Sequence, residues 1–557
     1  MINQQEQKTC QNCKSVFTIE PDDFAFYEKM KVQAPILCPE CRFKRRAMFR
    51  NEMSLYNRTC QKCDKRILTM YAPESPYTVY CIECWDSEGW DPFSYGVEYD
   101  LNKPFYEQFG ALMRTVPKRA VGITSGQGPN VNSDYVNFAA AVKNCYLLFN
   151  TSLCEDSLYS RGLANCKEVM GMYFGINNEL CYEGVNVHKS SRVVFGRNVN
   201  GSLDSMFLLN ASGCQNCFAS VNVRNKSNLW FNEEISKEEY AKRLAEVQGS
   251  YGGMQKMRAK FQEHILKYPQ RENNNIKTVD SSGDYLFESK NVQHSFEVTK
   301  GENCKYLFFS KQIKDSYDTL GHGFDSELLL DCCATGLSSN IIGTYWAESS
   351  KNIRYSFFVR NCSDCFGCDG IKNGNYSLLN KKYSKEEYEE LTEKIKAQMS
   401  EAGEFGMFMP PSIAPFAYNE TVAQDNMPMT KEEALKAGYR WQDNLQHTTG
   451  KETMKAKDIP DHIKDVKDNI TDEVLACITC GRNYKITSAE LLLYRKMILP
   501  IPRNCFYCRH ADRIKRRGSF ALYNRTCAKC SKNIKTTYAP DRPEIVYCES
   551  CYNSEVA

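Results

Sequence analysis

The residues best suited to chemistry in this 557-residue chain are its 28 cysteines. Sixteen of them form eight C-x-x-C pairs, four near each end of the chain. Two such pairs supply four thiolates in a tetrahedron, the usual ligand set of structural zinc. About four zinc ions per chain are therefore predicted. The predicted ligands are Cys10, Cys13, Cys38, Cys41, Cys60, Cys63, Cys81, Cys84, Cys477, Cys480, Cys505, Cys508, Cys527, Cys530, Cys548 and Cys551.

The two cysteine-rich ends are copies of one module. Each C-terminal ligand lies 467 positions after its N-terminal counterpart, as in 477 − 10 = 467, so every spacing between cysteines is shared. The segment YNRTC also occurs in both copies, at 56–60 and 523–527. An internal duplication of a double zinc-binding module explains both observations.

The order of features within a module is typical of a treble clef. After the knuckle at Cys60, strand-like stretches at 66–71 and 77–80 predict a hairpin, and Cys81 then opens a helix. Sequential pairing of the knuckles is the simplest arrangement, and interleaved pairing has the same spacing. Disulfides and a rubredoxin-like iron site are the other uses of such cysteines.

A basic segment follows Cys41, and its copy follows Cys508. Each holds six cations and one acidic residue, a net charge of +5. The planar fork of arginine suits phosphate, so these segments predict contact with a nucleic acid backbone at low sequence specificity. The predicted contacts are Arg42, Lys44, Arg45, Arg46, Arg50, Arg509, Arg513, Lys515, Arg516 and Arg517. The alternatives are a solvated basic helix and arginines that screen the anionic thiolate clusters. Arg58 and Arg525 directly precede knuckles and are expected to be structural.

The first module also carries a recognisable motif. A C-x-x-C pair, an acidic and aromatic stretch at 22–28 and the segment PILCPECRFKRR at 35–46 follow one another. This pattern resembles a small treble-clef zinc domain of uncharacterised bacterial proteins. The whole arrangement resembles an uncharacterised family of large zinc-ribbon proteins with a repetitive centre, often labelled CaiB/BaiF. That label implies a coenzyme A transferase, but the chain has no nucleotide-binding βαβ pattern and no candidate for the required aspartate.

Between the modules the chain repeats every 12 residues. From Cys145-Tyr146 to Cys217-Phe218, a small or β-branched residue followed by a bulky apolar one recurs at this step. Short strands at a fixed period predict a β-solenoid, with two 12-residue units in each coil. A weaker array at 284–380 has steps nearer 10 to 11. Both arrays end alike, at Ser236 and Ser384, where a capping box predicts a helix that closes the array.

The central cysteines have two candidate uses. Most fall on or beside the repeat register, where a small buried side chain is needed, and are predicted to pack in the core: Cys145, Cys154, Cys166, Cys181 and Cys304. A further metal site is the alternative for Cys214, Cys217, Cys362, Cys365 and Cys368.

The composition, 42% hydrophobic and 25% charged, is that of a globular chain of several domains. The polar start at 1–8 and the absence of a run of 18 apolar residues predict a cytoplasmic protein without a membrane segment. The predicted domains are a zinc module at 1–90, a connector at 91–130, one solenoid lobe with its capping helix at 131–270 and another at 277–400, a linker with short helices at 401–474, and the second zinc module at 475–557.

The predicted fold is therefore mixed and β-rich, with solenoid-like repeats and capping helices flanked by duplicated treble-clef or zinc-ribbon modules. The favoured function is non-enzymatic binding of nucleic acid through the paired zinc modules. The alternative is a scaffold for protein interaction or self-assembly, which includes a homo-oligomer. A solenoid-based carbohydrate-active enzyme is a lesser alternative, with Asp315, Asp325 and Asp331 lining a groove. No catalytic residue is predicted.

Overall fold

The computed structural model describes residues 5–122 and 128–556. Residues 1–4 of the polar start, residues 123–127 of the predicted connector and residue 557 lie outside this description. The chain divides into two compact units. Unit 1 consists of Met1–Val121, Asn273–Asp443 and Lys535–Thr537, and unit 2 of Gly122–Glu272, Asn444–Ile534 and Tyr538–Ala557. Each unit thus joins a zinc module to the repeat array that lies further from it in sequence.

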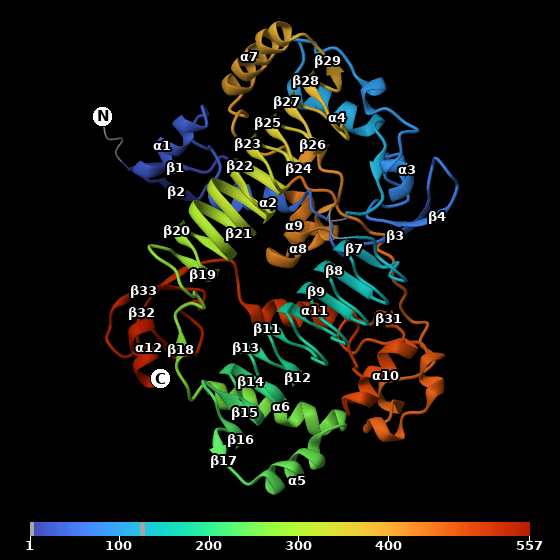
Figure 1. The fold of residues 1–557 in the computed structure, drawn as a ribbon, viewed down its shortest axis with the longest axis vertical. Coiled ribbons are helices and arrows are strands. Elements are labelled where there is room, and N and C mark those ends of the chain that lie inside the picture. Colours follow the sequence, from blue (N-terminus) through green and yellow to red (C-terminus); the bar gives the residue numbers. More distant parts are fainter. Residues whose placement is uncertain (1–4, 123–127, 557) are drawn as a thin grey trace. The chain divides into compact units, whose positions relative to one another are not determined.

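The first array forms a parallel sheet in unit 2, here called ladder 1 (Figure 1). Residue i lies opposite residue i + 12, as Tyr173 lies opposite Val185. Adjacent strands are therefore one 12-residue unit apart, and the expected 24 residues per coil is wrong. The strands are β7 Val136–Ala140, β8 Tyr146–Ser152, β9 Leu158–Ala164, β10 Tyr173–Ile176, β11 Val185–His188, β12 Ser191–Val194, β13 Arg197–Asn200, β14 Leu203–Ser212, β15 Gln215–Val221, β16 Ser227–Trp230 and β17 Glu233–Glu234.

The second array forms ladder 2 in unit 1. Its register is also 12 in most pairs, as between Lys351 and Ser363, so the expected steps of 10 to 11 are wrong. One extra residue enters between β21 and β22, where Ile313 lies opposite Ser326. The strands are β19 Gly283–Phe287, β20 Lys290–Gln293, β21 Ser295–His322, β22 Ser326–Thr335, β23 Ser339–Ile342, β24 Tyr345–Glu348, β25 Lys351–Arg354, β26 Phe357–Arg360, β27 Ser363–Phe366, β28 Asn375–Leu378 and β29 Lys381–Lys382.

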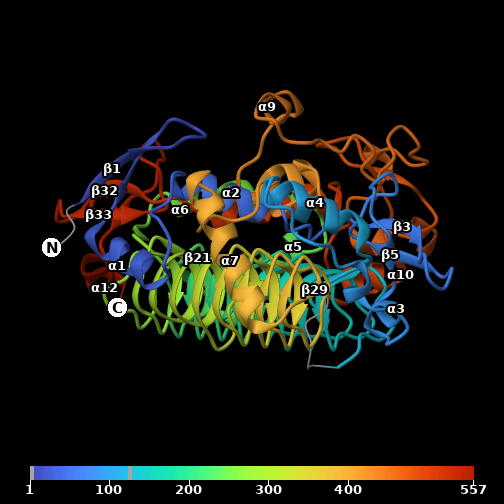
Figure 2. The same cartoon turned by 90° about the horizontal axis from the view of Figure 1, so that it is seen from above.

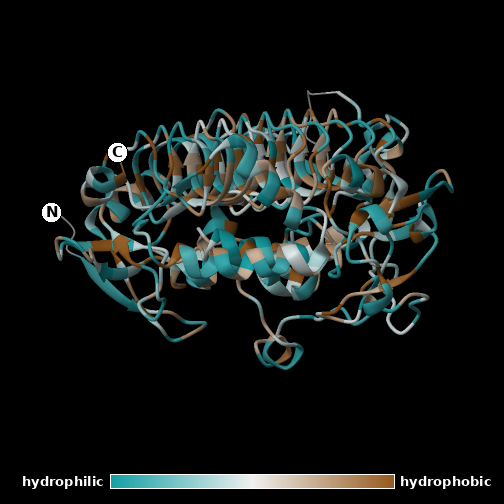
Figure 3. Ribbon diagram, turned by 90° about the horizontal axis from the view of Figure 1, so that it is seen from below, coloured by the Kyte–Doolittle hydropathy of each residue, from teal (hydrophilic) through white to brown (hydrophobic). Residues whose placement is uncertain are grey.

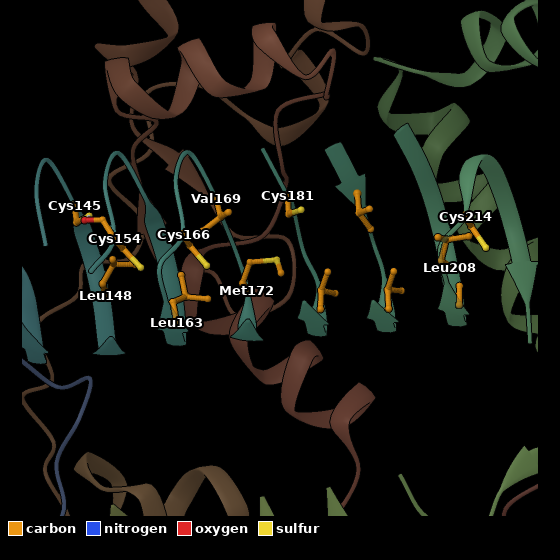
Figure 4. Close-up of a cluster of buried hydrophobic side chains, with 14 of the residues drawn as sticks. Cys145, Leu148, Cys154, Leu163, Cys166, Val169, Met172, Cys181, Leu208 and Cys214 are labelled. Carbon is orange, nitrogen blue, oxygen red and sulfur yellow. The ribbon is translucent and has the colours of Figure 1, made fainter. Parts of the chain in front are cut away.

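A period of three governs the inside of each ladder. The buried core residues of ladder 1 are all separated by multiples of three, and Figure 4 shows several of them, including Cys145, Cys154 and Cys181, along successive strands. A residue with positive φ precedes many inward positions, such as Asn144 (φ 54°) before Cys145. Asparagine tolerates this left-handed conformation better than most residues. In ladder 2 the extra residue shifts the same period by one position.

Polar columns on the outside fix the register. The amides of Asn186, Asn198 and Asn210 bond to one another in sequence, at 3.1 and 3.0 Å. In another column Lys143 pairs with Glu155 at 2.8 Å. A shift of register would place like charges together, which is unfavourable. Hydrophilic and hydrophobic residues accordingly alternate within the ladders (Figure 3).

Both ladders end as predicted. A short antiparallel strand follows the last parallel one in each, β17 after β16 and β29 after β28. The hydroxyls of Ser236 and Ser384 then accept bonds at the starts of helices α5 (Lys237–Val247) and α7 (Lys385–Glu401), which confirms both predicted helices. In unit 2, α6 (Tyr251–Ile265) and β18 (Gln270–Arg271) follow α5.

The modules consist of short strands and helices (Figure 2). In module 1, Arg66–Thr69 pairs with Tyr56–Thr59, and Val79–Tyr80 pairs with Lys118–Arg119, so the hairpin predicted between 66–71 and 77–80 is wrong. Residues 1–121 contain β1 Glu6–Thr9, β2 Val16–Ile19, α1 Pro21–Lys29, α2 Pro39–Ala47, β3 Tyr56–Thr59, β4 Arg66–Thr69, β5 Val79–Tyr80, α3 Ile82–Asp86, η1 Pro92–Tyr95, α4 Phe105–Thr115 and β6 Lys118–Arg119. Module 2 contains β30 Leu475–Ala476, β31 Asn483–Tyr484, α10 Ser488–Lys496, α11 Phe506–Arg517, β32 Tyr523–Thr526, β33 Asn533–Thr536, β34 Val546–Tyr547 and α12 Glu549–Val556.

The segment predicted as a linker holds the expected short helices, and its first part packs into unit 1, where Phe408 and Tyr418 are fully buried. The helices are η2 Pro411–Ile413, η3 Tyr418–Glu420, α8 Val422–Asn426, α9 Lys431–Lys436, η4 Ala456–Asp458, η5 Ile463–Asp465 and η6 Asp468–Thr471. Within 5–122 and 128–556, no helix is both long and apolar enough to cross a bilayer.

The left-handed positions give the first testable prediction. Asn303 (φ 53°) bonds to the side chains of Asn291 and Asp315. Asn303→Val should lower the free energy of unfolding by about 2 to 3 kcal/mol, because a β-branched residue is strained there and two hydrogen bonds are lost. Glu302→Val, at the exposed neighbouring strand position, should cost less than about 1 kcal/mol. Hydrogen exchange of ladder 2 amides measures both, and equal losses would contradict the conformational explanation.

Candidate metal centres and the basic helices beside them

Sixteen cysteines gather into four clusters of four thiols, and in each cluster all sulfur atoms lie within 4.8 Å of one another. The clusters confirm sequential pairing of the knuckles and match about four zinc ions per chain. They are Cys10, Cys13, Cys38 and Cys41; Cys60, Cys63, Cys81 and Cys84; Cys477, Cys480, Cys505 and Cys508; and Cys527, Cys530, Cys548 and Cys551.

The distances between sulfur atoms suit a tetrahedral metal. The Sγ atoms of Cys13 and Cys38 are 3.6 Å apart, and those of Cys480 and Cys505 are 3.7 Å apart. Four sulfurs at about 2.3 Å from a central zinc are separated by about 3.8 Å. A disulfide needs about 2.05 Å instead. All four sites therefore have the donor set and the spacing of a closed, structural zinc site.

Backbone N–H groups favour the thiolate form that a metal needs. The N–H of Cys81 donates to Cys60 Sγ at 3.2 Å. Burial raises the pKa of Cys60, but the N–H groups of Cys81, Lys62 and Cys63 outweigh it and hold that pKa at about 7. The thiolate is the metal ligand, so these donors prepare the site for zinc.

The first zinc site of each module also holds the start of a basic helix. Cys38 is the N-cap of α2, and Cys505 is the N-cap of α11. The predicted nucleic-acid contacts lie on these two helices or directly after them. Six of the ten are buried: Arg42, Arg46, Arg50, Arg509, Arg513 and Arg517.

In unit 1, α2 lies against ladder 2 through ion pairs. Arg42 Nε contacts Asp318 at 3.0 Å. Arg46 Nη1 contacts Asp318 at 3.2 Å and Asp331 at 2.5 Å. Burial raises the pKa of Asp331, and the guanidinium of Arg46 opposes that rise. Buried charges are tolerated when they are paired in this way.

In unit 2, α11 lies against ladder 1 around one carboxylate. Glu183 accepts from Arg513 at 2.7 Å and lies 3.4 Å from Arg516 and 3.7 Å from Arg509. Glu183 is only 3% exposed, so three guanidinium groups surround a charge that water scarcely reaches.

The two helices dock through equivalent residues. Arg46 and Arg513 are 467 positions apart, the offset of the modules, since 46 + 467 = 513. Their acceptors Glu183 and Asp331 are 148 positions apart, the offset of the array ends, since 183 + 148 = 331. Both acceptors have φ 52°. The duplication therefore includes the ion pair between module and ladder as well as the modules themselves.

A stacking contact is duplicated in the same way. The guanidinium of Arg42 lies 5.1 Å from the ring centroid of Tyr306, and that of Arg509 lies 5.0 Å from that of Tyr159. Arg42 and Arg509 are again 467 positions apart. Charge and stacking together give each helix one position on its ladder.

The other predicted contacts are more accessible. Lys515 is exposed, and Lys44, Arg45 and Arg516 are half-buried. Arg45 donates to the carbonyl of Met409 at 2.9 Å. Arg516 contacts Glu183 and Asp512. Phosphate contact stays a prediction, and the residues most accessible for it are Lys44, Arg45 and Lys515.

Arg58 and Arg525 are structural, as expected. Arg58 donates to the carbonyls of Ala72 and Tyr77 at 3.2 and 3.0 Å. Arg525 makes the two corresponding bonds in module 2. Each guanidinium thus links the strand before a C-x-x-C pair to the loop that follows the next strand.

Glu183 and Asp318 were not predicted from the sequence, and Asp331 was predicted to line a groove and not to pair with an arginine. A usable signal exists for two of them, since Glu183 and Asp331 each follow the bulky residue of a repeat and keep the 148-residue offset. Acidic residues at turns are common, so this signal identifies the acceptors only when it is combined with the knowledge that the arginines are buried.

The central cysteines lie inside the ladders. Cys214 Sγ donates to the carbonyl of Ser212 at 3.3 Å, and Cys365 Sγ donates to that of Ser363 at 3.3 Å. Core packing of Cys145, Cys154, Cys166, Cys181 and Cys304 is confirmed, because all five are buried. In the part of the chain that the structure describes, only the four module clusters have metal-site geometry.

The three candidate groove carboxylates do not act together. Asp331 is buried against Arg46, and Asp315 pairs with Lys29 at 3.1 Å. Asp325 lines an open groove of about 870 Å³ on ladder 2. A pair of carboxylates flanking one substrate bond is therefore not formed by these residues.

Comparisons with known proteins add little. No family model and no curated protein matches the chain. Among solved structures, 23 chains match. One is described as a "putative acetyltransferase from Desulfovibrio desulfuricans G20", with 9% identity, 45% of this chain and 66% of that chain covered, and a TM-score of 0.12. A similarity at that TM-score carries no argument about fold or activity.

Metal content provides the second prediction. Purified protein should contain about four zinc ions per chain, and Cys505→Ser should lose about one, because three thiolates hold zinc less well than four. Cys181→Ala, inside ladder 1, should keep all four. Elemental analysis after desalting measures the ratio, and a value near two in the wild type would contradict four independent sites.

Proposed function

We propose that the protein is a non-enzymatic, zinc-binding scaffold built from two copies of one clamped unit. In each unit a zinc module is fastened over one side of a repeat ladder, and the ladder's other faces are left for a protein partner or a second copy. The observation that carries this proposal is the repeated ion pair, Arg46 with Asp331 and Arg513 with Glu183.

We also propose that each ladder is a β-solenoid with 12 residues in each coil. The support is the parallel register of 12 and the inward period of three. The same proposal includes membership of the zinc-ribbon family that the sequence resembles. It also includes a reducing, cytoplasmic location, where the many thiols do not form disulfides.

The clamp gives the third prediction. Arg46→Met should lower the free energy of opening of α2 and β22 by about 3 to 5 kcal/mol, because it leaves Asp331 buried without its cation. Arg45→Met, one position away and bonded only to a carbonyl, should cost about 1 kcal/mol. Native-state hydrogen exchange measures both. Unchanged protection of β22 in Arg46→Met would show that the ion pair does not hold the module, provided that four zinc ions are still bound.

Nucleic-acid binding is the second candidate function. It is favoured by the more accessible cations of α2 and α11, Lys44 and Arg45 in one copy and Lys515 in the other. Because only these three of the ten predicted contacts are both accessible and not paired with a carboxylate of the described chain, the electrostatic contribution should be modest.

The fourth prediction concerns this candidate. Gel-shift titrations of duplex DNA and structured RNA at several salt concentrations should give a log-log slope no steeper than about 2.7, or about 0.9 for each of three contacts. Lys44→Glu combined with Lys515→Glu should abolish binding, whereas Lys242→Glu on α5 should not. A slope near nine would mean that the buried arginines contact phosphate after all. No binding at low salt would contradict nucleic-acid binding and leave the scaffold as the proposed function.

A further inference from the structure

Ladder 1 carries a column of mostly bulky apolar side chains on its outer surface. Each member lies opposite the next at the 12-residue step. The column consists of Tyr146, Leu158, Met170, Tyr182, Val194, Met206, Phe218 and Trp230. An apolar stripe of this length needs cover from other parts of the protein.

Separate elements of unit 2 provide that cover. The ring of Tyr182 meets Tyr494 of α10, with centroids 5.9 Å apart. The ring of Trp230 meets Tyr240 of α5, with centroids 6.3 Å apart. Between these two places the column borders a cavity of about 370 Å³.

The cavity is mostly apolar and has protein on several sides. Its walls come from β12 and β14, from α5 and from the end of α10, and its volume lies in the range of small-molecule sites, about 300 to 1,000 Å³. The apolar side chains that line it are Leu180, Val194, Met206, Leu244, Met497 and Ile498.

The same place is filled in the other copy. The counterpart of Met206 in ladder 2 is Arg354, since 206 + 148 = 354, and the counterpart of Arg192 is Asn340. Arg354 reaches across to Asn340 and donates to its carbonyl at 2.6 Å and to its side-chain oxygen at 3.0 Å. Unit 1 therefore closes the position with its own side chain, whereas unit 2 leaves space there.

One residue of the cavity wall is conformationally strained. Ile498, at the end of α10, has φ 52° and is 46% exposed. A β-branched residue is unfavourable in this conformation. Its counterpart Lys31 has φ 56° and is not β-branched. Of the two modules, only module 2 thus has an apolar, strained side chain at this position. This side chain, Ile498, borders the cavity.

The charges at the cavity favour an anion. Arg192 is paired with Asp204, and Lys496 is paired with Glu168 at 2.7 Å. Lys237, at the start of α5, is exposed and has no ion pair within the described ranges of the chain. Three cations line the cavity, and Asp204 and Glu168 neutralise two of them. The positive charge of Lys237 therefore remains for a ligand with a single negative charge.

We propose that this cavity binds a small amphipathic carboxylate. The apolar part of the ligand packs against Val194, Met206 and Leu244, and its carboxylate faces Lys237. The site lies wholly within unit 2 and does not depend on whether the protein acts as a scaffold or binds nucleic acid.

Calorimetric titration of the zinc-loaded, full-length protein with decanoate tests the proposal. Saturable binding of one decanoate per chain is expected, with a negative heat-capacity change from apolar burial. Decylamine should bind much more weakly, because its ammonium meets Lys237. Lack of saturable decanoate binding, or equal binding of the two probes, would overturn the proposal.

Matched variants locate the site. Ala241→Trp, on the exposed face of α5 that lines the cavity, should abolish binding, whereas Ala245→Trp on the same helix outside the lining should not. Lys237→Glu should weaken decanoate binding about three- to tenfold, as expected for reversal of one surface charge. The same change at its counterpart Lys385 should have no effect. Decanoate binding that survives Ala241→Trp would place the ligand elsewhere.

Discussion

A 12-residue repeat places few side chains in the buried core of its ladder, and this constraint shapes the rest of the protein. Only every third residue points inward, so thiols, hydroxyls and small aliphatic groups fill the ladders, while rings such as Tyr182 and Phe218 remain outside. If these rings were exposed to water, each ladder would lose the stabilising free energy that comes from burying them. The zinc modules and the capping helices supply the missing cover. Zinc in turn gives the modules a rigidity that segments with so small a core otherwise lack.

Electrostatics decides where the cover attaches. Apolar contact alone is non-directional and would let a helix slide along a column that repeats every strand. A buried guanidinium tolerates no such shift, because it must stay beside its carboxylate. Arg46 meets Asp318 and Asp331 of ladder 2, and Arg513 meets Glu183 of ladder 1. We infer that these pairs mainly specify the position of each helix, while the net stability comes from the apolar cover.

The sequence predicted what local spacing determines. Zinc ligands, their pairing, the 12-residue period and the helices after Ser236 and Ser384 all follow from positions along the chain. The role of the arginines did not follow, since a run of charge shows its sign but not its partner. The period of ladder 2 was misread as 10 to 11, whereas most of its strand pairs have a register of 12, and one extra residue before Ser326 shifts the inward phase. The assignment of each module to the sequence-distant ladder is tertiary information that no local pattern carries.

The duplication also separates what the fold requires from what it permits. The ion pair and the cation–π contact between module and ladder occur in both copies, so they belong to the architecture. Met206 and Arg354 occupy equivalent positions but differ in chemistry: one borders open space and the other crosses to Asn340. A ladder can therefore close this place with its own side chain. In unit 1 the same fold fills this position with a side chain. The cavity in unit 2 therefore results from the particular residues around it and is not imposed by the packing of the fold.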